Sequence, residues 1–215
     1  NVKQIHGLAD RKDKVSDAFR RLGVTFRKLK QDKALLFYIL AYFFYIDGVY
    51  TIISLATTYG AEVGISSTQL ILALLLTQFV AFPSAIFVSG LAARYGTIRM
   101  IRLSILAYTV ICLFGYQLDQ AWEFWVLAVA VGLLQGGIQS LSRSQFGRMI
   151  PKDEANEYFG LFDVFGKGAD FFGPLIMAAS AFVLGSSSYG VLALVVLFII
   201  GYILLVKSEK HSNAK

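Results

Sequence analysis

The chain of 215 residues is 56 % hydrophobic and only 16 % charged, and its mean hydropathy is +0.62. A soluble domain carries roughly a quarter charged residues, so this composition excludes an ordinary water-soluble domain and indicates an integral membrane protein. The net charge of +6 would suit nucleic acid, but the basic residues lie at the ends of apolar runs. There a cytoplasmic membrane surface is the expected partner, and we expect no nucleic acid.

Cysteine and histidine give no sign of a disulfide or a metal site. The single cysteine, Cys112, lies inside an apolar run, and the two histidines, His6 and His211, lie in opposite tails. We therefore expect no intrachain disulfide, no metal and no cofactor. No Ser/His/Asp or Cys/His arrangement and no phosphate-binding glycine pattern indicates an enzyme. The first residue is Asn1 rather than Met, and we expect the chain to be part of a longer protein.

The leading segment, residues 1–33, holds ten of the twenty Lys and Arg residues. Apolar residues recur in it at intervals of four and three, which makes a stripe on one helix face. They are Val15, Phe19, Leu22, Phe26 and Leu29. A basic amphipathic helix of this kind can lie on an anionic leaflet. A connector that packs on the cytoplasmic ends of its neighbours fits the pattern equally well.

Six apolar runs follow, each long enough or nearly so to cross a bilayer core of about 30 Å, which takes about 20 helical residues. They predict transmembrane helices over residues 34–59, 68–93, 98–116, 124–142, 158–184 and 189–206. Residues 207–215 form a short tail. The sequence therefore predicts an all-α integral membrane protein with one six-helix domain, 34–206.

The connections between these runs alternate in charge. GAEVGISS, QLDQAWE and GSSS contain no Lys or Arg, whereas RYGTIRMIR and RSQFGRMIPKDEANE carry three basic residues each. The positive-inside rule puts the two basic loops and both termini in the cytoplasm. We expect a multi-pass protein of the cell membrane.

The first and fourth runs share a pattern, because FYILA at residues 37–41 matches FWVLA at residues 124–128. The second and fifth each carry a proline, Pro83 and Pro174. Two groups of three helices that start on opposite sides would form an inverted repeat, as in many transporters. Chance similarity between apolar helices is the alternative. Gly132 and Gly136 in the fourth run have the small-xxx-small spacing of close helix packing.

Four stretches carry a family resemblance: AYFFYIDGVYTI, QFVAFPSA, GLLQGGIQSLSRSQFGRMIPK and EYFGLFDVFGKGADFFGPL. With them the chain resembles the C-terminal six-helix half of a major facilitator superfamily transporter, in the branch of the vacuolar amino-acid effluxers and their bacterial relatives. The superfamily's cytoplasmic loop signature is only half present in SGLAARYGTIR. Ala93 stands where its Asp belongs, which puts a gating latch on that Asp in doubt.

The resemblance implies alternating access, with a small-molecule substrate bound near the midplane between two six-helix halves. The first, second, fourth and fifth helices would face that cavity, and the third and sixth would face lipid. The partner would be a missing N-terminal half or a second copy of the chain. Export of amino acids is the function that the resemblance suggests first. A non-transporting membrane scaffold or sensor, and a self-contained homodimeric carrier, are the rival interpretations.

The first run carries a polar stripe that begins at Asp47 and continues through Thr51, with Tyr50 beside it. A carboxylate in mid-membrane costs about 2.5–3.5 kcal/mol on insertion scales, so it needs water or a partner. The stripe predicts either a cavity lining or an interhelical hydrogen bond or ion pair. A buried Asp47 would also suit proton coupling. Gln135 and Gln139 form a similar stripe on the fourth run, and Gln78 is a further cavity candidate.

The fifth run contains three ionisable residues, Asp163, Lys167 and Asp170, at spacings that share one helix face. Its twelve Leu, Ile, Val and Phe residues favour insertion by roughly 4–7 kcal/mol. Three central charges would cost about 7–10 kcal/mol on the same scale, so they cannot face lipid. They form either a charge network at the cytoplasmic mouth or a contact with substrate or a coupling proton. The expected network partners are Arg94, Arg143 and Glu157.

Overall fold

The computed structural model describes residue 20 and residues 22–62, 64–117, 120–185 and 187–212. His6, Val15 and Phe19 lie outside the described residues. The described part consists of helices joined by short turns and contains no strand. Residues 22–31 form a helix ahead of the main elements. Those elements are α2 (Lys33–Glu62), α3 (Ser67–Tyr95), α4 (Thr97–Tyr116), α5 (Ala121–Met149), the 3-10 turn η1 (Lys152–Glu154), α6 (Ala155–Gly168), α7 (Phe172–Leu184) and α8 (Ser187–Ser212).

Six segments are long and apolar enough to cross a membrane, with η1, α6 and α7 together making the fifth. Large apolar side chains cover their outer surface. Phe79, Phe82 and Phe182 are 80, 75 and 91 % exposed, a surface that fits lipid rather than water. The prediction of an all-α membrane protein with six membrane-crossing segments is confirmed. The inverted repeat stays a prediction.

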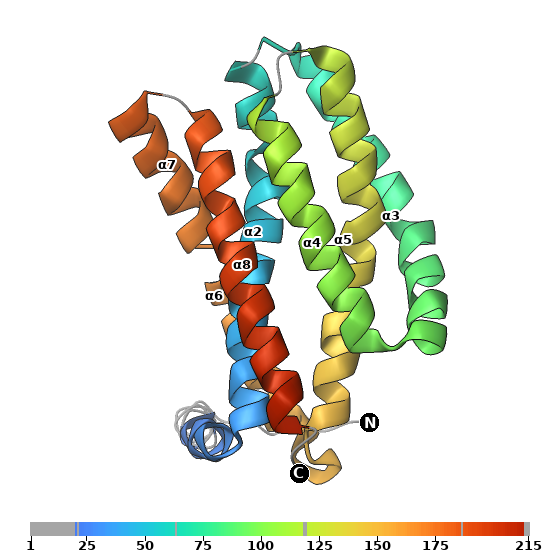
Figure 1. Ribbon diagram of the computed structural model, residues 1–215, viewed down its shortest axis with the longest axis vertical. Helices are drawn as coiled ribbons and strands as arrows, with labels where there is room; N and C mark the ends of the chain where they lie inside the picture. The colour runs from blue at the N-terminus through green and yellow to red at the C-terminus, as the bar shows by residue number, and fades with distance from the viewer. Residues whose placement is uncertain (1–19, 21, 63, 118–119, 186, 213–215) are drawn as a thin grey trace, which may run out of the picture.

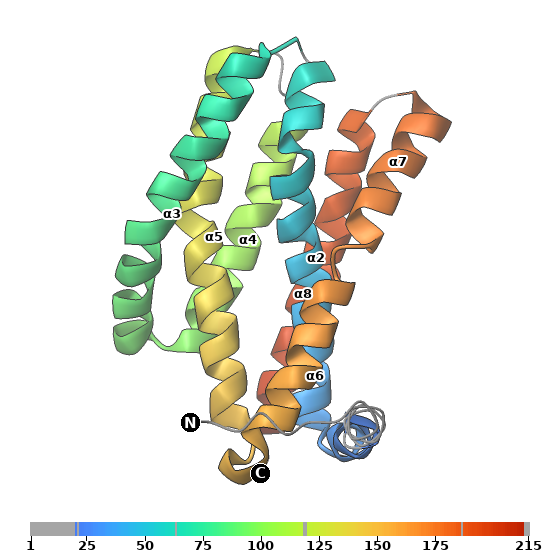
Figure 2. The ribbon, with the colours of Figure 1, turned by 180° about the vertical axis from the view of Figure 1, so that it is seen from behind.

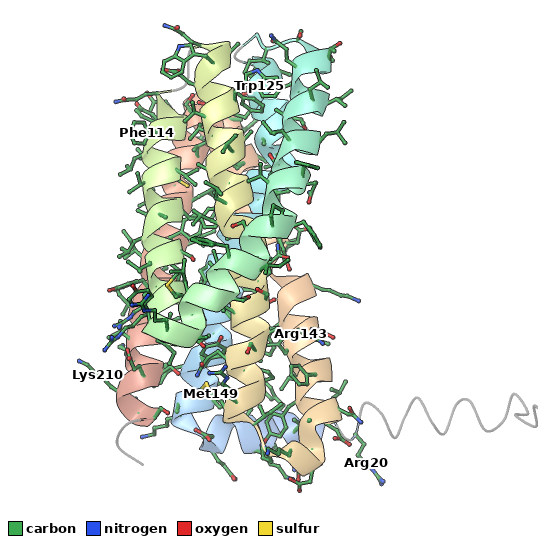
Figure 3. The ribbon with its side chains drawn as sticks, turned by 90° about the vertical axis from the view of Figure 1, so that its right-hand side faces the viewer. Arg20, Phe114, Trp125, Arg143, Met149 and Lys210 are labelled. Carbon is green, nitrogen blue, oxygen red and sulfur yellow. The ribbon has the colours of Figure 1, made fainter. Side chains whose placement is uncertain are left out.

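The helices run alternately up and down, so that α2 begins and α8 ends at the same end of the bundle (Figure 1). Two helix pairs dominate the packing, α2 along α8 and α3 along α5, and α4 contacts both α5 and α8. Trp125 and Phe114 lie near the end opposite to Arg20 and Lys210 (Figure 3). A tryptophan at one end and basic side chains at the other, each next to apolar spans, are compatible with two membrane interfaces.

Glycines on α5 let α3 approach closely. A Cβ at Gly136 would lie 2.6 Å from the Ala81 carbonyl oxygen, and one at Gly132 would lie 2.8 Å from the Thr77 carbonyl oxygen. Thr77 and Ser84 on α3 donate hydrogen bonds to α5 carbonyl oxygens at Ala128 and Leu133. The prediction that these glycines serve close helix packing is confirmed, and the contact resembles the small-residue interfaces of membrane helices.

A buried aromatic cluster joins α2 to α5 in the half of the bundle near the α2 start. The Tyr38 hydroxyl donates to the Ser142 carbonyl oxygen at 2.8 Å, and the Tyr45 hydroxyl lies 2.7 Å from the Ser142 hydroxyl. Phe146 stacks on Tyr38 and on Phe162 of α6. Because a bilayer core offers no water, these polar groups find their partners inside the protein.

The fifth segment is not the continuous helix that the sequence predicts over 158–184. It breaks after Gly168, and the chain resumes as α7 at Phe172 (Figure 2). Pro174 lies in the first turn of α7, where the N–H that proline lacks would have no partner within the helix, whereas Pro83 lies inside the continuous helix α3. The first bond into α7 comes from the Leu175 N–H, which donates to the Phe171 carbonyl oxygen at 3.4 Å.

The helix of residues 22–31 crosses the base of the bundle and is seen almost end-on in Figures 1 and 2. Leu29 is fully buried, and Leu22 and Phe26 pack against the same core. Lys28 forms an ion pair with Glu154, which raises the pKa of Lys28 above its ordinary value. The apolar stripe of this segment therefore packs on its neighbours over the described residues, as the connector alternative expected.

Candidate functional site

A polar cavity of about 610 Å³ lies between α2, α5 and α6. Tyr42, Tyr50 and Ser54 line it from α2, and Gln139 and Arg143 line it from α5. The α6 side and the break after α6 supply Phe162, Asp163, Gly166, Lys167 and Asp170. Two cations and two carboxylates thus line one hollow in a bundle with a largely apolar outer surface along its membrane-crossing segments.

An ion pair ties α5 to α6 across this cavity. The Arg143 guanidinium donates to the Asp163 carboxylate at 2.7 Å, and it lies 4.9 Å from the centre of the Phe159 ring. Arg143 reaches from α5 towards α6 in Figure 3. Both partners are about half exposed, so the pair contributes modestly to stability and can open when the helices move.

Lys167 and Asp170 are exposed to the cavity and stand apart from that pair. Among the described residues, neither forms an ion pair within 4.0 Å. Lys167 is thus outside any ion-pair network among the described residues, and its ammonium is available in the cavity. A membrane segment tolerates such a charge only where water or a ligand reaches it, and ionisable groups in these positions mark transport pathways.

Asp47 does not line the cavity. Its side chain is fully buried, and its two carboxylate oxygens accept from the Gly173 N–H at 3.0 and 3.1 Å. Gly173 is in the first turn of α7, where N–H groups have no partner inside the helix and the helix dipole favours a negative charge. Asp47 therefore caps α7 from a neighbouring helix, which is the structural alternative of the sequence analysis.

Thr51, one turn beyond Asp47, completes this contact. A Cβ at Gly173 would overlap the Thr51 hydroxyl, so only glycine allows α7 to come this close to α2. Thr51 also borders a second, apolar cavity of about 90 Å³, enclosed by Tyr59, Cys112 and Met177 among others. The polar stripe of α2 therefore faces α7, whereas the neighbouring face with Tyr50 borders the polar cavity.

Of the remaining residues that the sequence predicted for the site, some line the polar cavity and others lie elsewhere. Gln139 lies in the cavity lining, but Gln135, one turn away, has a buried side-chain oxygen without a hydrogen-bond partner among the described residues. Gln78 is exposed on α3, which contributes nothing to the lining. Arg94 stacks on the Tyr95 ring at 5.6 Å, and neither it nor Glu157 borders the cavity. Of the expected network partners, Arg143 is shown in an ion pair with Asp163.

Sequence reasoning missed two aromatic residues of the site. Tyr42 and Phe162 stack with ring centres 4.0 Å apart and line the cavity from α2 and α6. A signal was present, because Tyr42 lies eight residues before Tyr50, a spacing that puts both on one helix face. It was hidden by the many other aromatic residues of the first run. Among the described residues, no cluster of three or more His, Cys, Asp or Glu could hold a metal ion.

The chain is similar to known membrane transporters. Residues 2–215 match the family model described as vacuole effluxer, Atg22 like. The chain is 44 % identical over 191 residues to the uncharacterised MFS-type transporter YxiO of Bacillus subtilis, a match over 89 % of this chain and 45 % of that protein. It is 30 % identical over 217 residues to autophagy-related protein 22 of Coccidioides immitis, over 90 % of this chain and 35 % of that protein. The chain thus spans less than half the length of these relatives.

The contact between Asp47 and α7 leads to a prediction for hydrogen exchange. In Asp47→Ala the buried Gly173 N–H loses its acceptor, which costs about 1–3 kcal/mol and frees the start of α7. We expect amide exchange in the peptide that covers residues 169–175 to accelerate at least about fivefold by mass spectrometry of the reconstituted protein. Asp47→Asn, which keeps an acceptor oxygen, should remain near wild type.

The matched control is Asp170→Ala, which removes a carboxylate beside the same break but not the acceptor of the Gly173 N–H, which is Asp47. Equal exchange in Asp47→Ala and the wild-type protein would show that the carboxylate does not hold α7.

Proposed function

The chain belongs to the Atg22-like family of vacuole effluxers, and on that premise we propose that it forms one half of a secondary-active transporter for small polar solutes. The observation that carries the proposal is the polar cavity between α2, α5 and α6, which holds charges of both signs. A single six-helix half supplies one wall of a translocation pathway. The other wall would come from a further six-helix half of the complete protein, and the two would alternate access to a site near the midplane.

Amino acids fit the chemistry of this cavity. A zwitterion offers one carboxylate and one ammonium on the same carbon, and the cavity presents an ammonium on Lys167 and a carboxylate on Asp170 only three residues away. Tyr42, Tyr50 and Gln139 add hydrogen-bonding groups beside them. The word effluxer in the family description supports export as the direction. Following the positive-inside rule, we propose that both termini are cytoplasmic and that the protein lies in the cell membrane.

Arg143 and Asp163 would serve as a gate in this proposal. Their ion pair joins α5 to α6 along the same cavity, and it is exposed enough to form and break within one transport cycle. Closing the pair would narrow the space between the two helices, and opening it would release them.

Proton coupling through Asp47 is the second part of the proposal. A carboxyl group buried in mid-span can change protonation only if its surroundings rearrange, and the α7 start that it holds is such an element. Protonation would weaken the bond from the Gly173 N–H and thereby couple a proton to the position of α7.

The substrate role of Lys167 is tested by counterflow of labelled amino acids into proteoliposomes that contain the complete protein. A hydrogen bond to a charged group contributes about 1.5–3 kcal/mol, so Lys167→Gln should lower uptake at subsaturating substrate about 10- to 100-fold. Lys152→Gln removes the same charge from η1, outside the cavity, and should transport at the wild-type rate. Wild-type uptake by Lys167→Gln would contradict the assignment, and no counterflow by the unaltered protein would favour a scaffold.

In the same proteoliposomes, Asp47→Asn distinguishes a role of Asp47 in proton coupling from its structural role in holding α7. The amide keeps an acceptor for the Gly173 N–H but cannot exchange a carboxyl proton. We expect counterflow at neutral pH to persist, whereas uptake driven by an imposed pH gradient should be lost. Gradient-driven uptake that survives the substitution would rule out Asp47 as the coupling group.

A further inference from the structure

The start of α2 and the end of α8 meet at the base of the bundle, beside the helix of residues 22–31. The Ser208 hydroxyl donates to the Ala34 carbonyl oxygen at 2.7 Å, although 174 residues separate them. One turn along, the His211 ring lies 5.2 Å from the Phe37 ring, and the Lys207 ammonium lies 5.9 Å from the same ring. Residues from opposite ends of the sequence therefore form one surface.

This surface is basic. It carries four exposed lysines, defined here as the basic corner: Lys30, Lys33, Lys207 and Lys210. Among the described residues, none of the four forms an ion pair within 4.0 Å. Lys30 and Lys207 instead lie over the faces of Phe26 and Phe37, which orders their side chains and supplies no negative charge to neutralise them.

The acidic residues of the same region are engaged elsewhere. Glu209 lies between Lys207 and Lys210 in sequence, but it pairs with Arg102 of α4 at 3.2 Å. Glu154 pairs with Lys28. Asp32 accepts from the Ala34 and Leu35 N–H groups at 3.1 and 3.2 Å and so caps the start of α2. Within the part of the chain that the structure describes, no carboxylate therefore forms an ion pair with a lysine of the corner.

The corner also lies at the level of a membrane surface. Lys33 is the first residue of α2, and Lys210 is near the end of α8, so both flank apolar spans. The helix of residues 22–31 crosses the bundle axis here, as an interfacial helix does (Figures 1 and 2). Lys210 points outward from the base of the bundle in Figure 3. Long lysine side chains at such positions reach phosphate groups at the edge of the bilayer.

We propose that the basic corner is a binding site for the headgroup phosphate of an anionic phospholipid in the cytoplasmic leaflet. Basic clusters next to a membrane span attract anionic lipids, and the attraction falls off within a Debye length of the surface. A lipid bound here would tie α2 to α8 and to the helix of residues 22–31. It would thus stabilise the base from which α2 carries Asp47 and the cavity residues, without touching the cavity itself.

The test uses the complete protein in detergent and measures its thermal unfolding midpoint with and without added lipid. Phosphatidylglycerol should raise the midpoint by several degrees at low ionic strength, whereas phosphatidylcholine should not. In Lys33→Gln/Lys210→Gln the rise should fall to less than half, and in Lys33→Arg/Lys210→Arg it should persist. For each variant, the unfolding midpoint with lipid is compared with the midpoint of the same variant without lipid. A change in the basal stability of the variant therefore does not affect the measured rise.

Arg148→Gln/Lys152→Gln is the matched control, because it removes two exposed charges at the same end of the bundle but outside the corner. It should respond to phosphatidylglycerol like the wild type. A full response in the corner variant, or an equal loss in the control, would overturn the site. A response to glycerol 1-phosphate as strong as that to the lipid would contradict the lipid and indicate a soluble phosphate ligand. A response to an acidic peptide alone would indicate a protein partner.

Discussion

In the core of a bilayer no water is present to bind a free N–H group or a charge, so each one needs a partner from the protein or an aqueous pocket. The fifth segment has two features that need such partners, a break in its helix and three ionisable side chains. At the break, Asp47 accepts a hydrogen bond from the Gly173 N–H at the start of α7. The three ionisable side chains, Asp163, Lys167 and Asp170, line the polar cavity and not a lipid-facing surface.

The contact of Asp47 with Gly173 and the polar cavity are connected through α2. One face of this helix carries Tyr42 and Tyr50 to the cavity, and the adjacent face carries Asp47 and Thr51 to α7. The contact of Asp47 with Gly173 thus links α7 to the helix that carries Tyr42 and Tyr50 into the cavity lining. Few buried residues hold α7 in place, since only Gly173 and Met177 of its thirteen residues are buried. α7 packs mainly along α8 and meets α2 at Gly173, and a short helix with so few buried residues can shift at low cost, as transport requires.

Much of this arrangement could be predicted from the sequence. Long apolar runs bounded by basic loops identify membrane helices because the bilayer imposes length and composition on them. Gly132 and Gly136 predict close packing for a comparable reason, since only small residues let two helices approach. The energy of insertion alone shows that Asp163, Lys167 and Asp170 avoid lipid.

The rest depends on which groups meet in three dimensions. From the sequence alone, Asp47 fits both a cavity lining and a structural contact. The hydrogen bond from the Gly173 N–H, 126 residues away, shows that its role is structural in this fold. Pro174 signals a bend, but the length of the break after Gly168 depends on what caps α7. Arg94 was expected to join Asp163 on the basis of charge, yet α3 packs along α5 and leaves Arg94 outside the cavity.

The central claim, that water and not lipid surrounds the charges between α2, α5 and α6, is tested by thiol labelling in the membrane. In a Cys112→Ser background of the complete protein, Gln139→Cys and Phe79→Cys are exposed to a membrane-impermeant methanethiosulfonate on both sides. We expect Gln139→Cys to react, and Phe79→Cys to stay unmodified although the Phe79 side chain is 80 % exposed on the surface of the bundle. Labelling of Phe79→Cys with protection of Gln139→Cys would contradict this account.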